Sequence, residues 1–186
     1  MESLSVIRNV RRPGIFFDRD GVLNLDLGHV GSVERFIWIP GARQAVKLAN
    51  DSGYTTFVVT NQSGVARGLF TEADVRAIHE HMDLELGEIG ARIDSYAYCP
   101  HYVEGVLAEY AIQCNCRKPR PGMITELIKR WSVDPTSSIL IGDKATDLAA
   151  ARAAGIDAVL FPGGDLLDFL RTVLPTHGLA SGLTSE

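Results

Sequence analysis

The chain has 186 residues, of which 46% are hydrophobic and 22% are charged, as in ordinary globular proteins. We expect a single domain over residues 1–186, with a core from about residue 14 to residue 174 and a loose tail over residues 175–186. The formal net charge of −5 argues against a general affinity for nucleic acid or for an anionic membrane surface, and no apolar run reaches the length that spans a bilayer.

Strands and helices alternate along the chain. Short apolar runs predict β-strands at Ile15–Phe17, Thr55–Thr60, Ser95–Tyr98, Ile139–Ile141 and Ala158–Phe161. Helical patterns follow at Ala42–Asn50, from Thr71 to about Gly87, and at Pro121–Trp131, Ala145–Ala154 and Asp165–Val173. This order predicts an α/β fold, in which helices cover both faces of a Rossmann-like parallel sheet.

The first strand is followed by two carboxylates, Asp18 and Asp20. In an open α/β sheet, ligands bind at the carboxyl ends of the strands. Side chains two residues apart in an extended segment point to the same side, so this pair could share a metal ion. One carboxylate could also attack a substrate while the other transfers protons. Acidic pairs often cap turns as well, and the pair alone does not decide between these interpretations.

The second strand ends in the segment Thr60-Asn61-Gln62-Ser63-Gly64. Its hydroxyl and amide groups, together with the backbone N–H groups of a tight turn, suit the oxygens of a phosphate. A polar turn between a strand and a helix would have the same composition, and that alternative stays open.

Three cations, Arg117, Lys118 and Arg120, occupy one loop of an otherwise acidic protein. Lys118 could neutralise charge on a phosphoryl group, and Arg117 could hold a substrate phosphate. Pro121 could take the first turn of the next helix and leave the helix N-terminus free to face an anion. The alternative is a solvated basic loop.

The fourth strand leads into Asp143, which should lie beside Asp18 and Asp20 at the same edge of the sheet. A third carboxylate there would complete an oxygen-rich site for Mg²⁺. Asp147 falls in the first turn of the following helix, where it either complements the helix dipole or acts directly in catalysis.

The three cysteines, Cys99, Cys114 and Cys116, lie in one short region together with His101. A Cys₃His set satisfies tetrahedral Zn²⁺ without an open position, so the set predicts a structural zinc site. The spacing is not that of a common zinc finger, and three reduced thiols beside a loop histidine are the alternative. An odd, clustered set of cysteines without a signal peptide is typical of a reducing compartment, and we expect a cytoplasmic location.

Taken in chain order, these segments resemble the four motifs of phosphatases of the haloacid-dehalogenase (HAD) superfamily. DRDGV resembles the first motif, TNQSG the second, the Lys118 loop the third and GDKATD the fourth. The tracts FFDRDGVLN, VVTNQSGVARG, YCPH and CNCRKPRPGM are most similar to the D-glycero-D-manno-heptose 1,7-bisphosphate 7-phosphatase group, with histidinol-phosphate phosphatases as near relatives. The similarity covers Ile15 to about Phe161.

The resemblance implies a Mg²⁺-dependent phosphatase in which Asp18 attacks phosphorus and Asp20 is the general acid and base. Thr60 and Lys118 would bind the transferring phosphoryl group. The side chains of Asp18 and Asp143 and the backbone carbonyl of Asp20 would hold Mg²⁺, and the Cys₃His set would hold Zn²⁺. Substrate contacts are implied for Asp26, Leu27, Gly28, His29, Asn61, Gln62, Ser63, Arg117 and Lys144.

The intervals between the motifs bear on the substrate. None has room for a large cap domain, so the site should be screened only by loops. Thirteen positions separate His101 from Cys114, which resembles the longer loop of the heptose-bisphosphate group. The resemblance thus implies a small phosphorylated sugar as substrate, with removal of the 7-phosphate of a heptose bisphosphate on the route to ADP-heptose and lipopolysaccharide core. We expect no nucleic-acid or membrane partner. The oligomeric state stays open, and we favour a monomer.

Two alternatives differ from this interpretation in different ways. A histidinol-phosphate phosphatase would share the residues around the phosphate and differ in the loops near His29 and Arg117. A zinc-stabilised module that binds phosphorylated ligands without turnover would be expected to lack the nucleophile or the general acid, whereas Asp18 and Asp20 are both present.

Overall fold

The computed structural model of the chain describes residues 11–177. Within this range five strands form one sheet in the order β3-β2-β1-β4-β5, and every neighbouring pair is parallel. The strands are β1 (Arg12–Phe17), β2 (Thr55–Asn61), β3 (Ser95–Cys99), β4 (Val133–Gly142) and β5 (Asp157–Leu160). The predicted parallel sheet is confirmed, and β4 begins six residues earlier than its apolar run.

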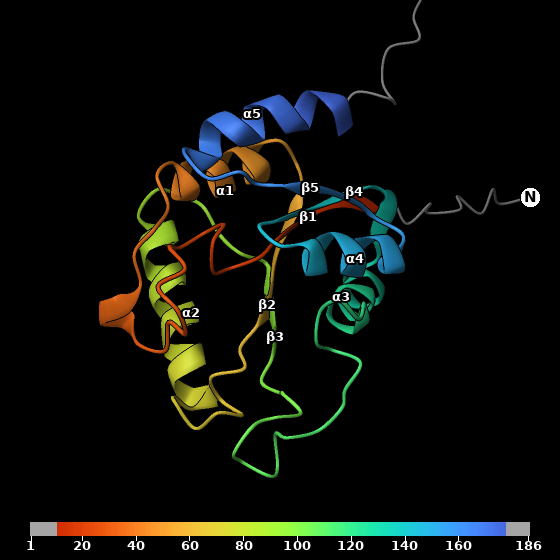
Figure 1. Cartoon of the computed structure of the whole chain (residues 1–186). Helices are drawn as coiled ribbons and strands as arrows, with labels where there is room; N and C mark the ends of the chain where they lie inside the picture. Colours follow the sequence, from red (N-terminus) through yellow and green to blue (C-terminus); the bar gives the residue numbers. More distant parts are fainter. Residues whose placement is uncertain (1–10, 178–186) are drawn as a thin grey trace, which may run out of the picture.

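Helices lie on both faces of this sheet, as predicted. Figure 1 shows α1 and α5 together with α2 on one side, and α3 and α4 on the other. Their bounds are α1 (Ala42–Asp51), α2 (Glu72–Gly87), α3 (Gly122–Trp131), α4 (Ala145–Ala154) and α5 (Leu166–His177), and a 3-10 turn, η1, spans Val33–Arg35. Helix α5 includes residues 175–177, which we expected to belong to the tail. The rest of that expected tail, and the first ten residues, lie outside the described range.

The central strand shows why both faces must be covered. Side chains alternate along a strand, so Ile15 and Phe17 pack into the core beneath α1, α2 and α5. Phe16 points to the opposite face and packs with Phe57 and with residues of α3 and α4. All these side chains are fully buried. A strand that is apolar on both sides is stable only between two layers of helices.

Local signals fix the ends of two helices. Thr71 and Asp74 form a reciprocal capping box at the start of α2, at the residue where the predicted helix begins. Gly155 ends α4 in the left-handed region, with φ of 76°, where a residue without a Cβ is favoured. No helix of the described part of the chain is long and apolar enough to cross a membrane.

The connections between strands leave the carboxyl edge of the sheet open. The chain from β1 to β2 holds a loop, η1 and α1, and the chain from β2 to β3 holds α2. A long loop without regular structure joins β3 to α3. In the described range no separate cap domain covers this edge, in agreement with the prediction.

Candidate active site

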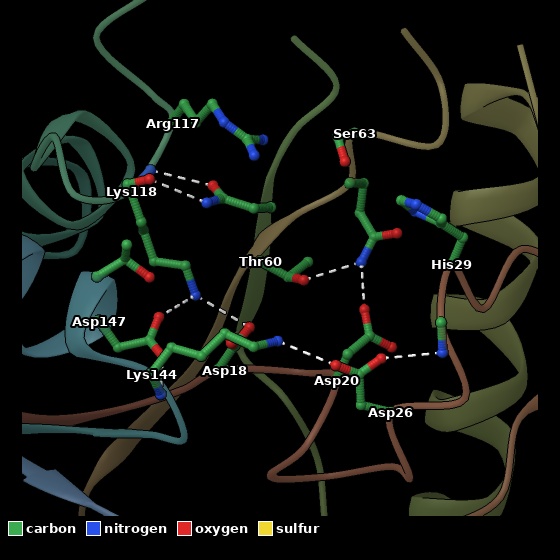
Figure 2. Close-up of a pocket in the computed structure, with 14 residues that line it drawn as sticks. Asp18, Asp20, Asp26, His29, Thr60, Ser63, Arg117, Lys118, Lys144 and Asp147 are labelled. Atoms are coloured by element: carbon green, nitrogen blue, oxygen red, sulfur yellow. Dashed lines mark hydrogen bonds and ion pairs between the residues drawn. The ribbon is translucent and has the colours of Figure 1, made fainter. Parts of the chain in front are cut away.

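A cavity of about 420 Å³ lies at the carboxyl edge of the sheet, where β1, β2 and β4 end. Parallel strands bring residues that are distant in sequence to one edge. Figure 2 shows side chains from these strand ends and from the surrounding loops converging on the cavity. It is lined by Asp18, Asp20, Asp26, Gly28, His29, Thr60, Asn61, Gln62, Ser63, Arg117, Lys118, Lys144, Thr146 and Asp147.

The expected catalytic residues all line this cavity, and so do all but one of the expected substrate-binding residues. The exception is Leu27, whose side chain does not line the cavity and is 46% exposed. Thr146 was not predicted.

A buried ion cluster forms the floor of the cavity. The Lys118 ammonium lies 2.9 Å from Asp18 Oδ1 and 2.6 Å from Asp147 Oδ1, and it donates a hydrogen bond to the Val59 carbonyl. Burial raises the pKa of Asp18 to about 6, an effect that the Lys118 cation opposes and the Asp147 carboxylate reinforces. Burial alone would lower the pKa of Lys118, but its two carboxylates raise it above the usual range. The cluster therefore keeps a positive charge beside the expected nucleophile.

Asp147 has two roles that the sequence did not combine. Its Oδ2 accepts the Lys144 N–H at 3.0 Å, which caps α4, and its Oδ1 pairs with Lys118. The side chain is 1% exposed. The sequence left open whether Asp147 complements the helix dipole or acts directly in catalysis, and neither the hydrogen bond to the Lys144 N–H nor the ion pair with Lys118 was predicted. The sequence marks Asp147 only by its place in the first turn of a predicted helix, four positions after Asp143.

The Asp20 carboxylate is surrounded by donors. It accepts hydrogen bonds from the Arg19 guanidinium, from Asn24 Nδ2 at 2.9 Å and from Gln62 Nε2 at 2.8 Å. Neither Arg19 nor Asn24 was singled out in the sequence, and no pattern there marks them as partners of Asp20. Together these donors fix where the expected general acid and base points.

The two amides expected to contact substrate are hydrogen-bonded to expected catalytic residues instead. Asn61 Nδ2 donates to the Lys118 carbonyl and Asn61 Oδ1 accepts the Lys118 N–H, both at 3.0 Å. Gln62 Nε2 donates to Asp20 and also to Thr60 Oγ1 at 2.9 Å. Both side chains line the cavity, but their polar atoms hold Lys118, Asp20 and Thr60 in place.

The loop between β1 and α1 borders the cavity on the other side, and we call residues 25–37 the flap. Its base is closed by a hydrogen bond from the Leu25 N–H to the Ile37 carbonyl. His29 lies in the left-handed region with φ of 49°, and the Arg35 guanidinium donates to its carbonyl and to those of residues 27 and 28. The flap is thus held in one conformation by its own polar contacts.

An ion pair links the flap to the opposite wall. Lys144 Nζ lies 3.0 Å from Asp26 Oδ2, and Figure 2 shows Lys144 reaching toward Asp26. Burial opposes the charged form of each group, yet their mutual contact lowers the pKa of Asp26 and raises the pKa of Lys144. An anionic substrate would meet this cation at the cavity wall.

The carboxylates at the cavity floor fit a hard divalent cation. Asp18, Asp143 and Asp147 each offer one oxygen, and these oxygens lie within 4.8 Å of one another. Asp143 Oδ1 is buried and has no hydrogen-bond partner in the described protein. Few carboxylates with room for water and phosphate oxygens are what Mg²⁺ requires. The expected pair of side chains, Asp18 and Asp143, is brought together, whereas the side chain of Asp20 is directed to other partners.

The cysteine cluster fits a tetrahedral metal ion. Cys99 Sγ lies 3.5 Å from Cys114 Sγ and 3.2 Å from Cys116 Sγ, and His101 Nδ1 lies 3.3 Å from Cys116 Sγ. A tetrahedral Zn²⁺ with Zn–S bonds of about 2.3 Å requires ligand atoms roughly 3.8 Å apart. Arg117 Nη1 donates to the His101 carbonyl at 3.3 Å, so the cluster is joined directly to a cation of the cavity.

Comparison with known proteins shows similarity over most of the chain. Residues 115–168 match the HAD-hydrolase-like family model. A D-glycero-beta-D-manno-heptose-1,7-bisphosphate 7-phosphatase from Rhodopseudomonas palustris is 52% identical over 164 residues, which are 88% of this chain and 91% of that protein. The enzyme of the same name from Haemophilus ducreyi is 45% identical, over 78% of this chain and 80% of its own length.

A solved structure is also similar. The D,D-heptose 1,7-bisphosphate phosphatase from B. bronchiseptica, complexed with magnesium and phosphate, is 37% identical and superposes with a TM-score of 0.74. The match covers 91% of this chain and 89% of that one.

Proposed function

The chain belongs to the D-glycero-β-D-manno-heptose-1,7-bisphosphate 7-phosphatase family of HAD-like hydrolases, and from this we propose that it removes the 7-phosphate of a heptose 1,7-bisphosphate with Mg²⁺ as cofactor. The observation that carries the proposal is the buried Asp18–Lys118–Asp147 cluster at the floor of a cavity whose walls hold Arg117 and Lys144. We further propose a monomeric, cytoplasmic enzyme whose product serves the synthesis of ADP-heptose for lipopolysaccharide core.

Phosphoryl transfer would begin at Asp18. A carboxylate oxygen of Asp18 attacks phosphorus, the bond from phosphorus to the 7-oxygen of the sugar breaks, and an aspartyl-phosphate forms. Lys118 and the Thr60 hydroxyl are placed to bind the phosphoryl oxygens while charge accumulates on them. Asp18 and Asp143, with the Asp20 carbonyl, would hold Mg²⁺, which when bound offsets the repulsion between an anionic nucleophile and a phosphate.

Asp20 would handle the protons of both half-reactions. It gives a proton to the departing 7-oxygen and later takes one from the water that hydrolyses the aspartyl-phosphate. Gln62 donates hydrogen bonds to both this carboxylate and the Thr60 hydroxyl. The proposed proton donor and a group proposed to bind the phosphoryl oxygens are therefore held in a fixed relative position. Arg117, Lys144 and His29 lie around the cavity and are the groups proposed to contact the rest of the substrate.

The test is phosphate release in the presence of Mg²⁺. We would compare both anomers of heptose 1,7-bisphosphate with histidinol phosphate, and use Asp18→Asn as the control. Fast release from a heptose bisphosphate that is lost in the variant supports the proposal. Preference for histidinol phosphate would keep the mechanism and replace the substrate. Release that is unchanged in Asp18→Asn would refute the assignment of the nucleophile, and ligand binding without any release would favour a non-catalytic module.

A further inference from the structure

Arg19, between the two expected catalytic carboxylates, is the largest of the fully buried side chains. Arginine is rarely buried without a partner, because removing its charge from water is costly. Within the described residues, Asp20 is the one carboxylate at ion-pair distance from Arg19. The chain therefore places a buried cation directly behind its expected general acid and base.

The contacts of Arg19 join two parts of the site. Its Nη2 lies 3.1 Å from both carboxylate oxygens of Asp20, and its Nε lies 3.3 Å from Oδ1. The same Nη2 donates to the Val30 carbonyl at 2.9 Å. Val30 is fully buried and follows His29 in the flap. One planar guanidinium thus orients the acid and base and anchors the flap to the core.

We propose that Arg19 is a positioning residue that couples the docking of the flap to the orientation of Asp20. This inference rests on the proposed function, because it assigns Asp20 the proton transfers of a phosphatase. A guanidinium offers several donors in one rigid plane. If the flap moves away from the core, the hydrogen bond from Arg19 to the Val30 carbonyl breaks. The Arg19 guanidinium is then less firmly held, and so is the Asp20 carboxylate that it binds. The proton donor is then well placed only when the loop that carries His29 is docked.

A second arginine provides a matched control. Arg35 also binds flap carbonyls, those of residues 27–29, but it is exposed and its hydrogen bonds go to these carbonyls and not to Asp20. Arg35→Met should therefore loosen only the tip of the flap, residues 27–29, and leave both the Val30 contact and the acid and base in place. Arg19→Met should disturb both, and the difference between the two variants isolates the coupling.

A purely structural role of Arg19 must be distinguished from this one. A structural defect would slow every substrate to the same degree. A misplaced proton donor slows only substrates whose leaving group needs a proton. A sugar alkoxide needs one, whereas 4-nitrophenolate leaves as the anion. The ratio of kcat/KM for heptose 1,7-bisphosphate to that for 4-nitrophenyl phosphate therefore reports on Asp20, and kcat/KM does not include hydrolysis of the aspartyl-phosphate.

The experiment measures this ratio in the full-length protein and in Arg19→Met, Arg19→Lys and Arg35→Met. We expect Arg19→Met to lower kcat/KM about 100-fold for the sugar phosphate and less than about threefold for the aryl phosphate. Arg19→Lys keeps the charge but not the planar fork, and should shift the ratio in the same direction. Arg35→Met should change the two substrates equally. Combined with Asp20→Asn, Arg19→Met should cause no further loss for the sugar phosphate.

Equal losses for both substrates, or a full additional loss in the Asp20→Asn background, would overturn the inference. Hydrogen exchange of residues 25–37 provides a readout that needs no turnover: it should increase in both Arg19 variants, and unchanged exchange would overturn the flap coupling. Failure of the proposed function looks different, because the unsubstituted protein would then release no phosphate from the sugar bisphosphate, or Asp18→Asn would release it equally well.

Discussion

The floor and the rim of the cavity are stabilised by different kinds of contact. On the floor, Asp18, Lys118 and Asp147 are almost fully buried, and each is fixed by an ion pair within a strand-end cluster. On the rim lie the flap and the loop of residues 99–117, which carries the candidate zinc ligands and which we call the zinc loop. These two segments are largely exposed and are joined to the cavity walls by hydrogen bonds and ion pairs such as Lys144 to Asp26 and Arg117 to the His101 carbonyl. We therefore expect the chemical step to depend on the rigid buried floor, and contact with the substrate to depend on the loops of the rim.

This difference gives the two sides different sensitivities. Breaking a buried ion pair leaves an uncompensated charge and costs both stability and catalysis. Breaking an exposed pair costs little by itself, because solvent screens it. Substitutions on the floor should therefore change kcat strongly, whereas substitutions on the rim should change mainly KM. The following predictions test that division.

The largest effect is expected for Asp147→Asn. Lys118 would keep one carboxylate of two, and the amide would place donor hydrogens near the ammonium. We expect kcat to fall about 100- to 1000-fold and the free energy of unfolding to fall by about 3–5 kcal/mol. Asp74→Asn is the matched control, because Asp74 occupies the same capping-box position in α2 without touching the cavity. That variant should lose about 1 kcal/mol of stability and keep kcat. Equal kcat in the two variants would contradict the role of Asp147.

Asn61→Ala should have the next largest effect. It removes the two hydrogen bonds to the backbone of Lys118 and leaves the Lys118 N–H and carbonyl unpaired at the edge of β2. We expect the loss of these hydrogen bonds to cost about 1–3 kcal/mol of transition-state stabilisation, which lowers kcat tenfold or more and leaves KM nearly unchanged. Steady-state kinetics separates the two readings of this residue: a rise in KM alone would restore Asn61 as a substrate contact.

On the rim, Cys114→Ser tests the zinc loop. We expect loss of one equivalent of bound zinc by metal analysis and a rise in KM of about tenfold, because Arg117 is held through the His101 carbonyl. The change in kcat should be small, since no group of the cavity floor is removed. Complete loss of zinc with unchanged kinetics would contradict this role of the loop.

The contrast between backbone topology and side-chain contacts also separates what the sequence could predict from what it could not. Strands and helices follow from local patterns: alternating burial on β1, the Thr71 cap and the Gly155 stop. The meeting of Asp18, Asp143 and Lys118 follows from topology, since parallel strands end at one edge. The elements and the convergence of these residues on the cavity floor could therefore be predicted, whereas the ion pair of Lys118 with Asp147 was missed.

The polar contacts around the floor could not be predicted, because they depend on side-chain directions set by tertiary packing. Asn61 and Lys118 are 57 positions apart, so no local pattern reveals that the amide of one pairs with the backbone of the other. The burial of Arg19 could not be predicted either, because arginine is usually exposed. At the start of α3, Pro121 is the N-cap and not the first helical residue, and the Gly122 N–H donates to the Asn115 carbonyl, a contact 7 positions back in the sequence that no local pattern reveals.

The smallest effect concerns a buried histidine of α2 near Arg19. His79 is almost fully buried, stacks on Tyr96 at 4.3 Å, and has no partner for Nε2 in the described protein. Burial, with a smaller effect of the Arg19 cation, lowers its pKa to about 3. The unfolded chain binds this proton near pH 6.5, so between pH 6.5 and pH 3 the unfolded state holds one proton more than the folded state. Stability must therefore decrease as the pH falls through this window, by up to about 1.4 kcal/mol per pH unit from this group.

Replacing His79 with Phe should preserve the stacking on Tyr96 and remove the contribution of this imidazole to the pH dependence of stability. Chemical unfolding at pH 7, 6 and 5 would measure it, and the upper half of the window is preferable because few carboxylates titrate there. We expect the stability of the variant to decrease less between pH 6 and pH 5 than that of the unsubstituted chain. An equal pH dependence of stability in the two proteins would mean that the His79 imidazole binds its proton as well in the folded state as in the unfolded state. The core would then have to hold a second cation beside Arg19. That arrangement would contradict the expectation that buried charges next to the cavity are balanced by ion pairs.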